Sequence, residues 1–108
     1  MKKRLITLLS ALVCASAQAE FFDGNMLLTR IKGDVYDYAN AIGYVTGVAD
    51  TMRNIAHCPP DNITAGQILD MVKKHLEDNP ATRHFTGDQH VVYVLKKAWP
   101  CAKKGSGV

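Results

Sequence analysis

The sequence lacks the patterns that mark most enzymes and metal proteins. It contains no glycine-rich phosphate loop, no H-E-x-x-H segment and no carboxylate pair at a telling spacing. The four histidines are His57, His75, His84 and His90, and they show no paired zinc-ligand spacing. We therefore expect a protein that is not an enzyme, with no catalytic residues, no metal site and no cofactor, and we interpret the histidines as scattered surface residues.

The chain also lacks an excess of basic residues once an N-terminal leader is set aside. The full sequence of 108 residues has 13 Lys and Arg against 10 Asp and Glu, a net charge of +3. Three of those basic residues, Lys2, Lys3 and Arg4, lie in the expected leader, which leaves 10 charges of each sign. A nucleic-acid-binding protein carries a basic stripe, so we expect no nucleic-acid partner.

No apolar run in the sequence is long enough to span a bilayer. The apolar stretch Leu5 to Val13 follows a basic cluster and precedes Ala17-Gln18-Ala19, a small-x-small site. This order is typical of a secretory signal peptide, although a retained N-terminal helix or anchor is the alternative. We expect residues 1–19 to be cleaved after Ala19, and residues 20–108 to form one exported domain with no stable membrane association.

Two cysteines remain in the expected mature chain, because Cys14 lies in the leader. An even pair in an exported chain predicts a disulfide between Cys58 and Cys101, which are 43 positions apart. Such a bond stabilises a small fold by about 4 kcal/mol in the loop-entropy model. The alternative is a catalytic thiol at Cys58 beside His57, but sequence neighbours rarely have nucleophile–base geometry.

Apolar residues at steps of three and four predict an all-α fold, a small disulfide-stapled bundle of about four helices. The expected helices cover 24–31, 35 to about 57, 65 to 79 and 87 to about 99. Asp23 and Asp34 are candidate N-caps of the first two helices. Thr64 and Thr86 are each followed three residues later by a glutamine, which is the spacing of a capping box.

The second helix is the longest, and its expected buried face repeats at helical spacing. That face comprises Val35, Tyr38, Ile42, Val45, Ala49, Met52 and Ile55 or Ala56. Gly43 and Gly47 lie beside it, although a glycine costs about 1 kcal/mol in a helix interior. They indicate either close approach by another helix or a local kink, and the sequence leaves both open.

Five segments of the expected mature chain carry a recognisable order of motifs. They are Phe22 to Leu28, Gly43 to Asp50, Cys58-Pro59-Pro60 running into Thr64 to Gln67, Leu76 to His84, and Ala98 to Cys101. Together these segments resemble the Rap/Tai family of type VI secretion immunity proteins. The chain departs from many relatives at Thr29-Arg30-Ile31 and Asn40-Ala41-Ile42, where an extra cysteine pair is missing. One staple of the family is therefore absent here, which bears on the packing of the first helix.

The resemblance implies a small, helical, homodimeric periplasmic protein. It would bind a peptidoglycan amidase effector from a neighbouring cell, occlude its active site and protect the cell wall, with a loop between helices in the enzyme's cleft. The candidate loop runs from Glu77 to Phe85, and we expect Asp78, Asn79, Arg83 and His84 to be its partner-binding residues. The alternatives are a purely structural corner between helices and, for the whole protein, a periplasmic acid-stress chaperone.

Overall fold

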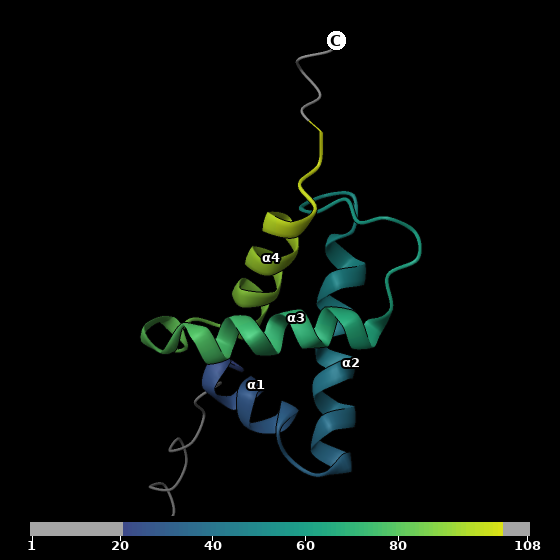
Figure 1. The fold of residues 1–108 in the computed structure, drawn as a ribbon. Coiled ribbons are helices and arrows are strands. Elements are labelled where there is room, and N and C mark those ends of the chain that lie inside the picture. Colours follow the sequence, from purple (N-terminus) through teal and green to yellow (C-terminus); the bar gives the residue numbers. More distant parts are fainter. Residues whose placement is uncertain (1–20, 103–108) are drawn as a thin grey trace, which may run out of the picture.

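The computed structural model describes residues 21–102, which form four α-helices and one short 3-10 helix (Figure 1). They are α1 (Gly24–Ile31), α2 (Val35–Met52), α3 (Ala65–Asp78), η3 (Pro80–Thr82) and α4 (Gly87–Ala98). This range contains no strand beyond two isolated bridges, so the all-α prediction is confirmed. The expected leader, residues 1–19, lies outside the described residues. Within 21–102, no helix is both long and apolar enough to cross a membrane.

The hydrophobic core lies where α3 crosses α2, with α1 and α4 packed beside the crossing (Figure 1). All four α-helices supply buried residues, and the fully enclosed ones include Leu27, Val45, Leu69, Val72, Leu76, Val91 and Leu95. Burying one such side chain contributes about 1.5–3 kcal/mol. The predicted stripe of α3, formed by Ile68, Leu69, Val72 and Leu76, is buried in full.

The predicted N-caps start the helices where expected. Asp23 accepts from the Met26 N–H at 2.9 Å, and Asp34 accepts from the Asp37 N–H at the same distance. Thr64 Oγ1 accepts from the Gln67 N–H at 3.1 Å. At α4 a capping box is present, in which the Thr86 N–H donates to Oε1 of Gln89 at 3.1 Å. These bonds satisfy N–H groups that a helix leaves without partners in its first turn.

The prediction that the second helix runs to about His57 is wrong, because α2 ends at Met52. Asn54 then adopts a left-handed conformation with φ of 62°, which asparagine tolerates better than most residues. The chain turns back so that His57 Nε2–H donates to the Ala49 carbonyl at 3.0 Å. His57 is only 1% exposed, so the expectation of a surface histidine is also wrong here.

The predicted buried face of α2 is correct only in its middle. Ala41, Val45 and Ala49 are buried, whereas Val35 is 82% exposed. Ile55 lies in the turn after the helix and is 73% exposed. The helix is longer than the elements packed on it, so its ends extend past the crossing with α3 (Figure 1). Periodicity identifies a helical face but does not reveal how much of it a partner covers.

A disulfide joins Cys58, after α2, to Cys101, after α4, as predicted. The Cys58 N–H also donates to the Trp99 carbonyl at 2.8 Å, so the two segments are paired beside the covalent link.

The start of α1 is held against the start of α4 although no disulfide links this helix to the rest of the described chain. The Gly24 N–H donates to the Phe85 carbonyl at 3.0 Å, and the Gly87 N–H donates to the Phe22 carbonyl at 2.7 Å. Leu27, Leu28 and Ile31 of α1 are buried. Main-chain pairing and apolar burial therefore hold the first helix in place.

Candidate functional site

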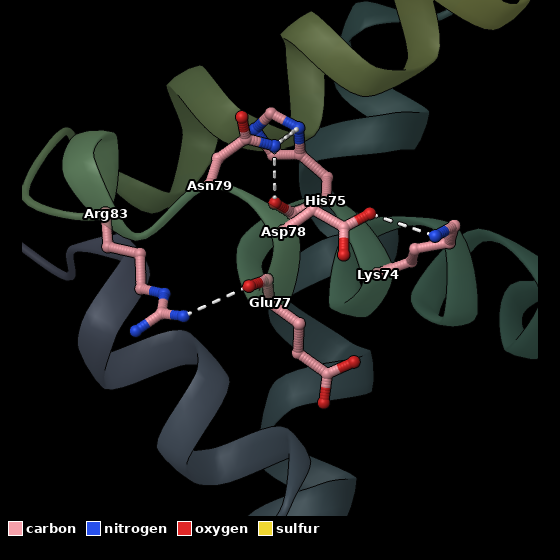
Figure 2. Close-up of polar contacts among 6 residues, drawn as sticks. All are labelled: Lys74, His75, Glu77, Asp78, Asn79 and Arg83. Carbon is pink, nitrogen blue, oxygen red and sulfur yellow. Dashed lines mark hydrogen bonds and ion pairs between the residues drawn. The ribbon is translucent and has the colours of Figure 1, made fainter.

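The corner between α3 and α4 is a closely bonded turn that carries all four predicted contact residues. Asn79 ends α3, and its Nδ2 donates to the His75 carbonyl at 2.9 Å (Figure 2). Pro80 opens η3, and the Phe85 N–H donates to the Thr82 carbonyl at 3.1 Å. The turn is therefore fixed by its own hydrogen bonds before any partner is present.

Arg83 folds back onto the end of α3. Its Nε donates to the Leu76 carbonyl at 2.6 Å. Its Nη2 donates to the Glu77 carbonyl at 3.3 Å (Figure 2). The last four carbonyls of a helix have no partner within the helix, so the guanidinium satisfies two of them. This geometry gives Arg83 a role in holding the corner together.

The four predicted residues lie on one corner but differ in what their side chains do. Asn79 and Arg83 bond the main chain of α3. Asp78 is exposed and pairs with Lys74 at 2.9 Å, an interaction of little energetic weight at a surface. His84 is exposed and its ring lies 4.5 Å from that of Phe85, centroid to centroid. Asp78 and His84 are thus the two whose side chains make no hydrogen bond to the main chain, while Asn79 and the neighbouring Phe85 are exposed as well.

Sequence reasoning missed a contact between two histidines beside this corner. Nε2 of His75 on α3 lies 3.2 Å from Nδ1 of His90 on α4. His90 is 3% exposed and its Nε2 has no hydrogen-bond partner of good geometry, so this histidine also differs from the surface position expected. The positions are 15 apart, and no single-helix spacing connects them.

The two histidines line a pocket of about 320 Å³. The other lining residues are Asn79, Thr82, Phe85, Gln89 and Tyr93. Burial is the main cause that lowers the pKa of both imidazoles below the ordinary histidine value. The pocket is therefore built from aromatic rings, amides and neutral imidazoles near pH 7.

The part of the chain that the structure describes contains neither a free cysteine thiol paired with a histidine nor a metal-binding cluster. Cys58 is bonded to Cys101, and His57 donates to a main-chain carbonyl. Residues 21–102 contain no group of three or more His, Cys, Asp or Glu side chains placed to hold a metal ion.

A second hollow of about 570 Å³ runs along α2 and α4. It is lined by Gly43, Tyr44, Gly47, Val48, Thr51, Met52, Asp88 and Val92. A Cβ atom added to Gly43 or Gly47 would meet nothing within 4 Å, so no helix of the described chain approaches these glycines closely.

The family comparison covers this fold from its first cap to its disulfide. The model of the Rap1a immunity proteins matches residues 23–101. Asp23 is the N-cap of α1 and Cys101 is the second cysteine of the disulfide, so the match includes the whole candidate corner. A comparison with curated proteins gave no match.

Proposed function

Because the chain belongs to the Rap1a immunity protein family, we propose that it neutralises a type VI secretion effector by binding it. The proposed effector is a peptidoglycan amidase, and the proposed mechanism is occlusion of its active site. An inhibitor of this kind acts without catalytic groups of its own, since a rigid surface that fills the cleft is enough.

The observation that supports occlusion most directly is the bonded corner between α3 and α4. A loop that is ordered before binding loses little conformational entropy when it binds. The Arg83 and Asn79 hydrogen bonds provide that order, and Asp78 and His84 project from it. A carboxylate and an imidazole supply acceptors and donors that suit a polar catalytic cleft.

We assign the four predicted contact residues two kinds of role. Asp78 and His84 touch the effector directly. Asn79 and Arg83 contribute by holding the corner in shape, and the guanidinium N–H groups that remain add a contact at its edge. The site is thus one surface with a supporting layer beneath it.

The inhibition experiment uses the purified protein and an amidase effector encoded beside it. We expect no hydrolase activity from the protein alone and loss of the amidase activity on peptidoglycan at a near-equimolar ratio. In cells that produce the amidase in the periplasm, we expect rescue by the immunity protein with its leader and no rescue by a leaderless version, because the proposal includes export. If no neighbouring amidase binds and the protein instead suppresses aggregation in strong acid, the chaperone function replaces this one.

The residue assignment has its own test with a matched control. H84A and D78A should each weaken effector binding by about tenfold or more, which corresponds to about 1.4 kcal/mol or more, at an unchanged melting temperature. D61A removes an exposed carboxylate from the loop before α3 and should leave binding unchanged. The double variant R83A/H84A should weaken binding and also lower the melting temperature. Full inhibition by H84A and D78A would assign the corner to the scaffold alone.

We also propose that the protein is a homodimer, formed through the hollow along α2 and α4. Glycine in a helix interior costs about 1 kcal/mol relative to alanine, and Gly43 and Gly47 bring no compensating contact within the described chain. Close packing against a second copy would offset that cost. Sedimentation should show a smaller species for Gly47→Leu, whereas Gly66→Leu, at another open helical glycine, should sediment like the wild type.

A further inference from the structure

The contact between His75 and His90 ties together three parts of the fold. It joins α3 to α4 through the 3.2 Å approach of Nε2 and Nδ1. The other edge of the His90 ring faces α1, because a Cβ atom built on Gly24 would lie 2.8 Å from His90 Nε2. His75 also lies against the Tyr93 ring, with 5.2 Å between ring centroids. A change in this contact therefore affects the whole corner.

Asn79 determines where the protons of the two rings lie. Its Nδ2 donates to the His75 carbonyl at 2.9 Å, which fixes the orientation of the amide. The same Nδ2 lies 3.4 Å from His75 Nδ1, which turns an N–H donor toward that nitrogen and favours the tautomer in which Nδ1 carries no proton. His75 then carries its proton on Nε2 and donates it to Nδ1 of His90. Both rings are neutral in this arrangement.

A further proton has no position in this network that keeps every contact. On His75 it would occupy Nδ1 and face the N–H groups of Asn79. On His90 it would occupy Nδ1 and face the N–H of His75. A proton on His75 loses only the exposed 3.4 Å contact with Asn79 and keeps the donation from Nε2 to His90, so one proton on the pair leaves their bond in place. When both rings are protonated, two N–H donors face each other across 3.2 Å and the bond between α3 and α4 is lost.

Some charged and polar groups around the pair lower the pKa of the two histidines, and others raise it. Burial lowers the pKa of His75 first, and His90 and Lys97 of α4 lower it further, while Asp78 of α3 raises it. Burial is also the largest cause that lowers the pKa of His90, and His84 in the turn lowers it further. The Thr82 carbonyl and Asp23, at the start of α1, raise the pKa of His90, but the net shift is downward.

We propose that the His75–His90 contact is a pH-sensitive clamp, which closes the corner while one ring can accept from the other and releases residues 79–86 when both rings are protonated. The released segment contains His84 and begins directly after Asp78. This clamp is a property of the isolated protein and does not depend on the effector, so its failure and that of the immunity function are distinguishable.

The direction of the pH effect follows from the lowered pKa values. The clamp stabilises the closed corner fully above the ordinary histidine pKa of about 6.5. This stabilisation is lost as the pH falls through the lowered pKa values that the histidines have in the closed state. For each unit by which the pKa of a ring in the closed state lies below its pKa in the open state, acid makes the open corner about tenfold more populated relative to the closed one.

The test measures the wild-type protein first. An NMR titration of the imidazole Cε1–H signals should show that His75 and His90 protonate below the ordinary value. Amide exchange, corrected for its intrinsic pH dependence, should show residues 79–86 opening more often at pH 5 than at pH 7, with less change in the middle of α2. The proposal is overturned if both rings titrate at the ordinary histidine pKa, or if amide exchange of residues 79–86 does not change with pH.

A matched pair of variants separates the clamp from general acid sensitivity. In His75→Gln the amide donates to His90 Nδ1 at high pH and, once rotated, accepts from it at low pH. The pH dependence of corner exchange should therefore largely disappear. His84→Gln removes an exposed imidazole whose charge lowers the pKa of His90, so the pH dependence should remain, with its midpoint displaced to higher pH. A His75→Gln protein that opens with acid as the wild type does would also overturn the clamp.

Discussion

The Nε atom of Arg83 donates a 2.6 Å hydrogen bond to the main-chain carbonyl of Leu76, seven residues earlier in the chain. The Leu76 side chain is fully buried, so the bond attaches the turn to the edge of the core. A charged donor on a helix C-terminal carbonyl is also favoured by the helix dipole. Arg83 therefore acts as a side-chain cap at the end of α3.

Removing this cap should destabilise the fold. We expect Arg83→Ala to lower the free energy of unfolding by about 1–3 kcal/mol, because two helix carbonyls lose their donor. Urea denaturation measures the change. His84→Ala, at the next and exposed position, serves as the control and should stay within about 0.5 kcal/mol of the wild type. Equal stability of the two variants would contradict the capping role.

The disulfide should contribute much of the stability of so small a fold. Cys58→Ser is expected to lower the free energy of unfolding by about 2–5 kcal/mol. Cys101→Ser should have a similar effect, and the double variant should lose little more, because either change removes the same bond. Mass spectrometry of the native protein checks the premise, and two free thiols there would refute it.

Two helical glycines should respond oppositely to alanine. A Cβ atom at Gly87 would lie 2.9 Å from the ring of Tyr44, so Gly87→Ala should displace that ring and lower the melting temperature. At Gly47 the space is open, and alanine should raise the stability of the monomer by about 0.5–1 kcal/mol. Thermal melts at low protein concentration compare the two. A tolerated Gly87→Ala would show that the Tyr44 ring moves aside without loss of stability.

Tyr44 predicts a loss of stability in alkali. Burial, followed by the charge of Asp88, raises the pKa of its phenol above the usual value of about 10. The neutral phenol is therefore favoured in the fold, and its contribution is present below about pH 10 and lost as the pH rises through the raised pKa. The melting temperature should fall more between pH 9 and pH 11 in the wild type than in Tyr44→Phe. Parallel falls would contradict this.

The features that the sequence predicted well are local ones. Asp23, Asp34 and Thr64 start helices because each side chain reaches an N–H three residues ahead. The stripe Ile68 to Leu76 is buried because one helix face meets three neighbours. The disulfide followed from cysteine number and expected export. The four corner residues were also located together, since they are close in sequence.

The features that the sequence could not predict depend on distant parts of the chain. The early end of α2 results from a left-handed Asn54 and from the return of His57 to the Ala49 carbonyl. The contact of His75 with His90 depends on how α3 lies against α4, which periodicity does not describe. The sequence favours Arg83 as a contact residue because its side chain can hydrogen-bond to a polar cleft, and only its bonds to α3 reveal its structural role.

The disulfide also determines what a protease can do to this protein. Cys58 and Cys101 close a covalent ring that contains α3, η3 and α4, and the exposed corner lies inside that ring. A peptide bond cut anywhere within the ring leaves both halves attached through sulfur. A nick at the corner would therefore release no fragment, and the cleaved protein would separate into two pieces only after reduction.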